Sequence, residues 1–177
     1  MINAIVEPWI QTYSGRKFDF LNIDVNTIDI TDIAHALSNL CRYTGHTKYF
    51  YSVAQHSVLA AISVPQEYKF AALLHDATEA YINDISKPLK NLLPQYCKIE
   101  DDIWLKIAEK FGLPEEIPAL VKEVDLRLLV TEKRDLLETE PDEWTIIDKI
   151  KPYEEKIIPW SPEYAKERFI KTFNLLI

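Results

Sequence analysis

Apolar residues recur every three to four positions along most of this chain, which is the spacing of an amphipathic α-helix. Near the N-terminus the pattern changes: between Trp9 and Phe20, apolar and polar residues alternate around a Ser-Gly pair, which is typical of a short β-hairpin. We therefore expect an all-α fold with one small N-terminal hairpin. The helices are predicted near residues 31–45, 50–63, 65–83, 94–111, 118–138 and 161–177.

Several predicted helix ends coincide with residues that favour them. Thr31 can cap the first helix, and Pro94 and Pro118 suit the first turn of a helix. Gly112 suits the position after a last turn, because glycine readily adopts the left-handed conformation found there. Residues 139–160 are polar and contain several prolines, so we expect a connecting segment before the last helix.

The chain is predicted to form a single domain. Its 177 residues, 47% of them hydrophobic, can bury a substantial core. No repeat, low-complexity tract or flexible linker divides the sequence. We place the core at about residues 30–138, with an N-terminal flap at 1–29 and a C-terminal helix at 161–177.

The composition argues against several classes of function. Only 3 glycines are present, so the glycine-rich phosphate loops of Rossmann and P-loop proteins are absent. The net charge of −8 argues against binding to nucleic-acid polymers or anionic membranes, because both attract basic surfaces. No apolar run approaches the roughly 20 residues of a membrane span. We therefore expect a soluble protein. Cys41 and Cys97 form no CxxC pair and no disulfide framework, so we expect it in the reducing cytoplasm.

Polar residues interrupt an apolar helical stretch at ALLHDATEAYINDISKPLK, residues 72–90. Its alanines and leucines indicate a buried face, yet His75, Asp76 and Glu79 lie among them, with Glu79 one helical turn beyond His75. Burying polar groups without partners costs on the order of several kcal/mol. Either ordinary hydrogen bonds or a bound ion must therefore satisfy these three side chains.

Two further polar residues lie on apolar helical faces. His56 shares a face with Val53 and Ala60, where a histidine is more often a hydrogen-bonded core residue than a ligand. Asp125 follows Val121 by four residues in the middle of a predicted helix, so it cannot be a cap. An internal salt bridge and a metal ligand are equally open interpretations of Asp125.

Taken together, His56, His75, Asp76 and Asp125 offer two imidazoles, two carboxylates and no thiolate. The adjacent His75 and Asp76 can chelate one ion jointly if neighbouring helices supply further ligands. Nitrogen and oxygen donors suit one divalent ion of Mn, Co, Fe, Zn or Mg better than a closed structural zinc site.

The order H…HD…D, found in YSVAQHS, LLHDATE and VKEVD, resembles the HD-domain metal-dependent phosphohydrolases over roughly residues 30–138. Within that superfamily the closest resemblance is to the 5′-deoxynucleotidases and related deoxynucleoside triphosphohydrolases. LCRYTGHT places Arg42 fourteen residues before His56, similar to the arginine that grips phosphate in the 5′-deoxynucleotidases. HDATEAYINDISKPLK is similar to their HDxxE motif, which is followed by an aspartate and a proline-containing loop with a lysine. Those nucleotidases usually have tryptophan after the arginine, where this chain has Tyr43.

The resemblance implies roles in metal binding, catalysis and phosphate binding. It makes His56, His75, Asp76 and Asp125 the ligands of one divalent metal ion, Glu79 and Asp84 catalytic residues, and Arg42 and Lys90 phosphate contacts. Taken alone, Arg42 could instead complement a helix C-terminus, and Lys90 could be a solvated loop charge.

The implied fold is an HD-domain helical bundle, and the implied reaction is hydrolysis of a deoxynucleoside monophosphate to deoxynucleoside and phosphate. One alternative is hydrolysis of a deoxynucleoside triphosphate such as dATP with release of triphosphate, which needs further cations. Another is a non-catalytic HD-like scaffold that senses nucleotides. The expected partner is a small deoxynucleotide in the bacterial cytoplasm, or in the host cytoplasm for a phage-encoded protein. Phe173, Leu175 and Ile177 offer apolar surface for a homo-oligomer.

The remaining histidines and the aromatic residues of the flap have plainer interpretations. We expect His35 and His46 to lie outside the metal site, as surface or packing residues. Trp9, Tyr13 and Phe18 are predicted to form the core of the hairpin rather than a platform for stacking bases.

Overall fold

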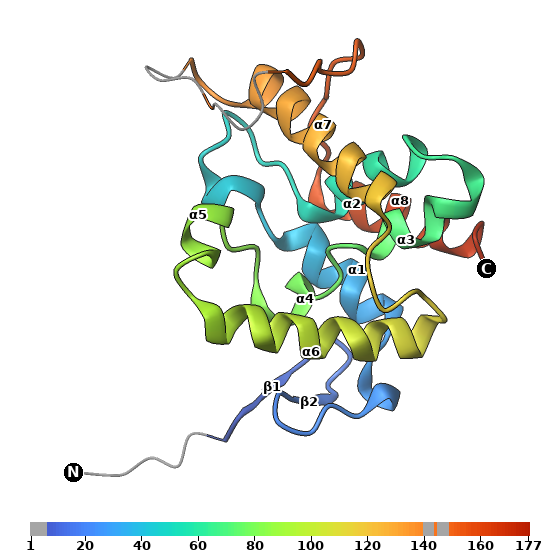
Figure 1. The fold of residues 1–177 in the computed structure, drawn as a ribbon. Coiled ribbons are helices and arrows are strands. Elements are labelled where there is room, and N and C mark those ends of the chain that lie inside the picture. The colour runs from blue at the N-terminus through green and yellow to red at the C-terminus, as the bar shows by residue number, and fades with distance from the viewer. Residues whose placement is uncertain (1–6, 140–143, 145–148) are drawn as a thin grey trace.

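The computed structural model describes residues 7–139, 144 and 149–177, and within them the chain is mostly α-helical with one two-stranded sheet (Figure 1). The predicted all-α fold with a small N-terminal hairpin is therefore confirmed. No helix in these ranges is long and apolar enough to cross a membrane. The strands are β1 (Trp9–Gln11) and β2 (Lys17–Asp19), the short 3-10 helices are η1 (Val25–Thr27), η2 (Arg42–Gly45) and η3 (Gln66–Tyr68), and the α-helices are α1 (Ile30–Asn39), α2 (Val53–Ile62), α3 (Lys69–Leu74), α4 (Glu79–Ile82), α5 (Lys87–Lys90), α6 (Pro94–Phe111), α7 (Ala119–Leu136) and α8 (Pro162–Asn174).

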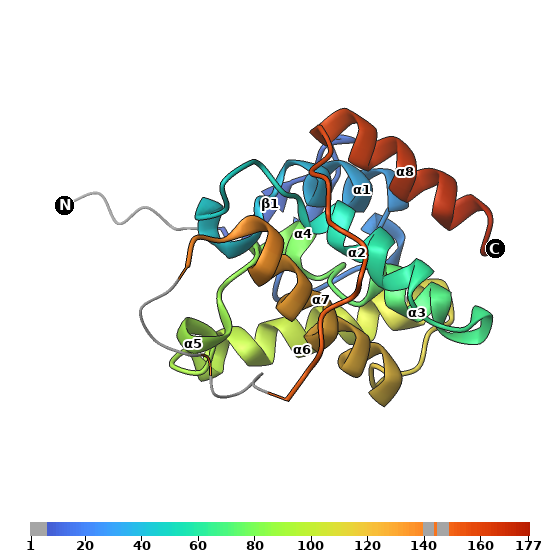
Figure 2. The same cartoon turned by 90° about the horizontal axis from the view of Figure 1, so that it is seen from above.

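Helix α2 lies at the centre of the bundle and is buried on almost all sides. Helices α1, α3, α7 and α8 contact it, and the two perpendicular views place them around it (Figure 1, Figure 2). Ser52 starts α2, because its side chain accepts a hydrogen bond from the backbone N–H of Gln55 at 3.1 Å. A polar side chain on α2, such as that of His56, must therefore find its partners inside the protein.

The hairpin packs against the helices through one of its faces. Ile10 lies opposite Phe18 in the register, and Phe18 is fully buried and stacks on Tyr81 with ring centroids 4.0 Å apart. The prediction that Trp9 and Tyr13 also belong to a hairpin core is wrong, because 37% of Trp9 and 60% of Tyr13 is exposed. Trp9 points away from the face of its neighbour Ile10, and Tyr13 lies in the turn between the strands.

Helix α1 differs from its predicted bounds at both ends. The side chain of Asp29 accepts a hydrogen bond from the backbone N–H of Thr31 at 2.8 Å, so Asp29 and not Thr31 is the N-cap. The helix ends at Asn39, well before the predicted end near residue 45. The reason is that Leu40 and Cys41 are extended, and that three residues of the following η2, Tyr43, Thr44 and Gly45, have positive φ angles that an α-helix cannot contain.

The continuous helix predicted over residues 65–83 is also wrong. The chain forms η3, α3 and α4 instead, with a tight turn after Leu74. In this turn the backbone N–H of Ala77 bonds to the carbonyl of Leu74 at 2.9 Å, and that of Glu79 to the carbonyl of Asp76 at 3.0 Å. These bonds span three residues rather than the four of an α-helix, so the backbone direction changes here.

Helix α8 completes the core with residues from the other end of the chain. The side chain of Ser161 caps it by accepting a hydrogen bond from the backbone N–H of Tyr164 at 3.3 Å. Ala165, Phe169 and Phe173 are buried, so Phe173 belongs to the core and not to an apolar surface, whereas Leu175 and Ile177 are exposed. Through this apolar face α8 packs against α1, α2 and α3.

Candidate metal centre

The four residues predicted to bind metal come together from three segments. His56 belongs to α2, His75 and Asp76 to the turn after α3, and Asp125 to α7. Ligand atoms of His56, His75 and Asp125 all lie within 4.8 Å of one another, so this group could hold a metal ion. Asp76 Oδ2 lies next to them, 3.2 Å from His75 Nε2 and 3.5 Å from His56 Nε2.

Hydrogen bonds fix the orientation of both imidazole rings. His75 Nδ1 lies 2.8 Å from the carbonyl oxygen of Ala72, which can only accept, so this nitrogen carries a proton. His56 Nδ1 donates in the same way to the carboxylate of Glu132 at 2.6 Å. The two Nε2 atoms consequently face each other 3.3 Å apart. Two lone pairs at this distance would repel, so a positive charge here is favoured, carried either by a proton on His56 Nε2 or by a bound metal ion.

The charges around the rings favour a cation as well. Burial and the positive charge of Arg42 lower the pKa of His56, but the carboxylates of Glu132 and Asp125 outweigh them and raise it to about 9. Burial alone would raise the pKa of Asp125, whereas its hydrogen bond to His56 and the charge of that ring lower it. The Asp125 carboxylate is 3.1 Å from His56 Nε2. Both effects indicate that positive charge is stabilised where the ligand atoms meet.

Glu132 of α7 is a fully buried carboxylate behind the histidines. It accepts hydrogen bonds from Tyr43 Oη at 2.6 Å, Tyr51 Oη at 2.8 Å and His56 Nδ1 at 2.6 Å. Burial would raise its pKa, but the charges of Arg42 and His56 hold it at about 2. Glu132 is therefore ionised and holds His56 in the orientation that presents Nε2 to the site.

Sequence analysis did not identify Glu132, although the sequence contains a signal for it. Glu132 follows Asp125 by seven residues, which is two turns of α7, so the two carboxylates share one face of the helix. Leu128 lies between them on that face and is buried. A second acidic residue on an apolar face already known to carry a ligand indicates a partner for that ligand.

Arg42 lies beside the candidate ligands, and only 12% of its side chain is exposed. Its Nη1 is 3.4 Å from Asp76 Oδ2, and its Nε is 3.2 Å from Glu132 Oε2. The backbone of η2 turns sharply after Arg42, because Tyr43 and Thr44 have φ angles of 56° and 53°. Such angles cost non-glycine residues energy, and the bond from Tyr43 to Glu132 helps to hold the turn.

Glu79 and Asp84, predicted to be catalytic, lie near the same group. Glu79 is buried at the start of α4, and its Oε2 has no hydrogen-bond partner among the residues that the structure describes. Burial and the negative charges of Asp76 and Asp84 raise the pKa of Glu79 well above its usual value. Burial likewise raises the pKa of Asp84, against the charge of Arg42. Glu79 begins α4, after the turn that contains His75 and Asp76, and not within one continuous helix with His75.

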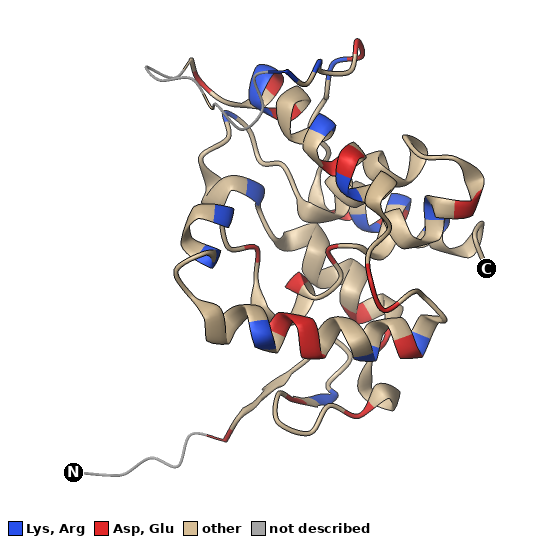
Figure 3. Ribbon diagram, viewed as in Figure 1, with Lys and Arg blue, Asp and Glu red and all other residues tan. Residues whose placement is uncertain are grey.

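Lys90, predicted to contact phosphate, is already in an ion pair. Its Nζ lies 2.7 Å from Glu100 Oε1, and 14% of the lysine side chain is exposed. Figure 3 shows the basic residues of α5 above an acidic stretch of α6, the helix that supplies Glu100. Burial lowers the pKa of Lys90, but the contact with Glu100 and, to a smaller extent, the charges of Glu79 and Asp76 raise it above its usual value. Lys90 thus lies near the site. Its partner Glu100 was not predicted from the sequence.

Known proteins of similar sequence were found, although no family model matches the chain. The uncharacterized protein YfdR of Escherichia coli (strain K12) is 47% identical over 167 residues, which cover 94% of this chain and 94% of that protein. The chain belongs to the YfdR family. An uncharacterized protein of Rhodobacter capsulatus is 36% identical over 124 residues, which cover 64% of this chain and 63% of that protein.

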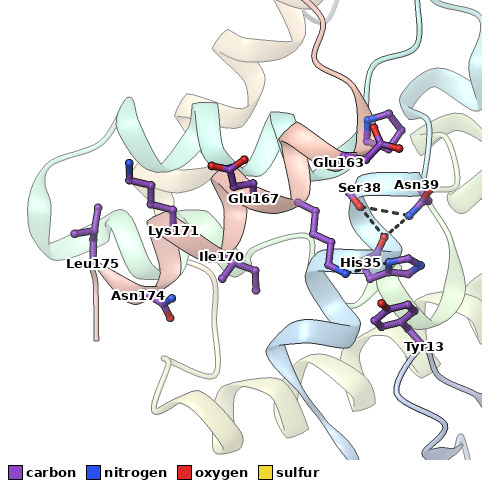
Figure 4. Close-up of a pocket in the computed structure, with 12 residues that line it drawn as sticks. Tyr13, His35, Ser38, Asn39, Glu163, Glu167, Ile170, Lys171, Asn174 and Leu175 are labelled. Carbon is purple, nitrogen blue, oxygen red and sulfur yellow. Dashed lines mark hydrogen bonds between the residues drawn. The ribbon is translucent and has the colours of Figure 1, made fainter.

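A second cluster, which contains one histidine together with Tyr13 and Lys166, lies away from these ligands in a groove of about 730 Å³ between α1 and α8. Its histidine, His35, stacks on Tyr13 with ring centroids 3.7 Å apart. Lys166 Nζ lies 3.3 Å from His35 Nδ1 and 4.3 Å from the centre of the Tyr13 ring. Figure 4 shows His35 and Tyr13 at one end of the groove and Leu175 at the other. His35 is thus outside the metal-ligand group, and the exposed His46 follows η2.

Proposed function

We propose that this protein is a metal-dependent phosphohydrolase of the HD-domain type that converts a deoxynucleoside monophosphate to deoxynucleoside and phosphate. The observation that carries this proposal is the convergence of two imidazole Nε2 atoms and two carboxylates beside a buried arginine. The partner-free oxygen of Glu79 adds a buried group with unused hydrogen-bonding capacity. We place the enzyme in the cytoplasm of a bacterium, or of the host if it is phage-encoded.

The donor set fits one divalent ion. His56, His75, Asp76 and Asp125 would hold it, and their nitrogen and oxygen donors suit Mn, Co, Fe, Zn or Mg. When bound, such an ion lowers the pKa of a nearby water and offsets charge on a phosphoryl oxygen. The two rings are oriented in advance by their Nδ1 bonds, so little rearrangement of side chains is needed.

The protein's own residues can bind the phosphate and handle the proton. Arg42 offers guanidinium N–H groups to the phosphate oxygens, and Lys90 can add a second charge if it leaves Glu100. In the reaction water attacks phosphorus and gives up one proton to Asp84 or to the phosphate, the P–O bond to the sugar breaks, and the leaving oxygen takes a proton from Glu79. Burial and the charges of Asp76 and Asp84 raise the pKa of Glu79, which favours its protonated form, so it can act as the general acid. Asp84 can orient the water.

Three of the five further cations that a triphosphate could use, Arg16, Lys17, Lys48, Lys87 and Lys122, are already in ion pairs, which favours a monophosphate as the substrate. A triphosphate needs cations beyond Arg42 and Lys90. Arg16 is engaged with Asp29 at 2.8 Å, on the hairpin side of the molecule. Lys48 lies 3.5 Å from Glu138.

The test is a panel of deoxynucleoside mono- and triphosphates, each incubated with Mn²⁺, Co²⁺ and Mg²⁺, with the products separated by ion exchange. Orthophosphate from a monophosphate is the expected result. Triphosphate released from a deoxynucleoside triphosphate would instead identify a triphosphohydrolase. No turnover of any nucleotide with all three metals would contradict an enzyme and favour a nucleotide-sensing scaffold. The Asp76→Ala variant serves as the inactive control.

A further inference from the structure

One oxygen atom belongs to two different sets of contacts. Asp76 Oδ2 lies 3.2 Å from His75 Nε2 and 3.5 Å from His56 Nε2, where the candidate ligand atoms meet. The same Oδ2 is 3.4 Å from Nη1 of Arg42. A metal ion held by the two rings and the guanidinium of Arg42 therefore compete for the negative charge of one carboxylate.

The other side of Arg42 is held independently of Asp76. Its Nε forms an ion pair with Glu132 Oε2 at 3.2 Å, although the geometry is not that of a hydrogen bond, and Glu132 is fully buried and fixed by Tyr43 and Tyr51. Because the guanidinium is planar and presents several N–H groups, Nε can stay with Glu132 while the terminal nitrogens change partners. Weakening the contact with Asp76 would thus leave Arg42 in place with donors available.

The local charge explains why this exchange matters for an anionic ligand. The carboxylates of Asp76 and Glu132 pair with the guanidinium of Arg42, and that of Asp125 pairs with His56. Even with Arg42 and His56 both positively charged, the three carboxylates leave an excess of negative charge, which repels a phosphate dianion. A divalent cation balances the excess and at the same time draws Asp76 away from Arg42.

We infer that Asp76 is shared between Arg42 and the metal site, so that binding of a divalent cation releases Arg42 from Asp76 and makes its guanidinium available to a phosphate group. This inference rests on the proposed function, because it assigns a metal and a phosphate to the same site. Linkage then requires the reciprocal effect: a phosphate that holds Arg42 tightens metal binding by the same factor. Arg42 is in this view both the phosphate contact and the sensor of metal occupancy.

The first experiment measures metal affinity without phosphate, by titrating Mn²⁺ into chelator-treated protein in a calorimeter. In Arg42→Gln the competition for Asp76 is gone, so Mn²⁺ should bind roughly tenfold more tightly, the low end of what a charge at this distance does to a proton equilibrium. Lys98→Gln makes the same change in net charge at an exposed i, i+4 pair with Asp102 and should leave the affinity unchanged. Unchanged or weaker binding by Arg42→Gln would overturn the inference, because a residue that merely braces the ligands loosens them when it is removed.

The second experiment measures the affinity for inorganic phosphate with and without bound Mn²⁺. Bound Mn²⁺ should increase the affinity for phosphate in both proteins, and this increase should be at least tenfold larger in the natural protein than in Arg42→Gln. A factor of ten is the low end of the effect of a close charge. Equal gains in the two proteins would mean that direct contact between metal and phosphate accounts for all the coupling, and would overturn the inference. If Arg42→Gln unfolds too readily for titration, Arg42→Lys replaces it, because an ammonium group lacks the planar set of N–H groups with which a guanidinium contacts two carboxylates. The same two comparisons then apply, with smaller changes in the Mn²⁺ and phosphate affinities.

Neither titration involves turnover, so the two proposals fail separately. Coupling that depends on Arg42, together with no hydrolysis of any nucleotide, would contradict the proposed function alone. Hydrolysis of deoxynucleotides, together with equal coupling in the natural protein and Arg42→Gln, would contradict the sharing of Asp76 alone.

Discussion

The protein contains two histidine clusters with opposite electrostatic surroundings. At the centre of the bundle, carboxylates hold the pKa of His56 at about 9 although burial and Arg42 lower it. In the groove between α1 and α8, burial and the positive charge of Lys166 lower the pKa of His35, and the charge of Asp32 only partly opposes them. One environment stabilises a cation on the imidazole and the other repels it.

The difference shows what distinguishes a metal site from a packed histidine. Both clusters contain rings in close contact with other side chains, and His35 is even the more accessible of the two. Only the central cluster has carboxylates on the ring nitrogens, at 2.6 Å on one side of His56 and 3.1 Å on the other. The neighbours of a histidine, rather than the histidine itself, decide whether it can bind a metal ion.

The strongest test of this comparison removes one histidine from each cluster. We expect the purified protein to contain about one divalent metal ion per chain, as an open site with four protein ligands should. His75→Ala should lose both the metal and the phosphohydrolase activity, because it removes one of two nitrogen donors. His35→Ala should keep both. Elemental analysis and phosphate release on the same preparations check this, and full metal retention by His75→Ala would show that the ligands are wrongly assigned.

A smaller but still large effect is expected for the proton donor. Glu79→Gln keeps the size of the side chain but removes its ability to transfer a proton, so turnover should fall by roughly 10² to 10⁴. Metal content and melting temperature should change little. Glu167→Gln is the matched control, because Glu167 lines the groove of the second cluster. Loss of metal in Glu79→Gln would make Glu79 a ligand, and unchanged turnover would transfer the catalytic role to Asp84.

The partner behind the ligand should have a moderate effect. Glu132→Gln removes the charge that orients His56, and loss of such a partner typically weakens metal binding by about 10- to 100-fold. Calorimetric titration of Mn²⁺ measures the affinity, and a thermal melt of the metal-free protein separates it from stability. Tyr51→Phe removes one hydrogen bond to the same carboxylate and should have a clearly smaller effect on Mn²⁺ affinity. Equal Mn²⁺ affinities in Glu132→Gln and the natural protein would contradict the positioning role.

The smallest effect is expected in the groove. Tyr13→Ala removes the ring that stacks on His35, an interaction of about 1 kcal/mol. The melting temperature should therefore fall by about 2 to 4 °C, the usual shift for a chain of this size. Metal content should stay the same. A loss of metal in this variant would link the two clusters and end the distinction between them.

The sequence predicted the longer helices and the convergence of the candidate ligands, because both depend on local spacing. The apolar period identified α6 and α7 to within two residues at each end. The four candidate ligands converge because each polar residue on an apolar stripe faces the same core. The continuous helix over residues 65–83 was predicted wrongly, since the three-residue hydrogen bonds of the turn after Leu74 leave no mark on apolar spacing.

The partners of the site residues were harder to predict. Lys90 belongs to α5 and Glu100 to α6, and only the packing of these two helices brings the charges to 2.7 Å. The exposure of Tyr13 depends on the hairpin turn, whose conformation an alternating pattern does not determine. Glu132 alone had a signal in its spacing from Asp125, and reading α7 as a whole face would have found it.

Helix α8 also constrains the order of events during synthesis. Its buried Phe169 helps to cover α1 and α2, which leave the ribosome much earlier. Gln55, the neighbour of His56, bonds to the carbonyl of Ile158 and the N–H of Trp160 at 2.8 Å each, just before α8 begins. Contacts between such distant parts of a chain form slowly and leave apolar surface uncovered until they do. A nascent chain that has not yet released α8 from the exit tunnel should therefore remain a substrate for chaperones, with His56 and its neighbours incompletely positioned.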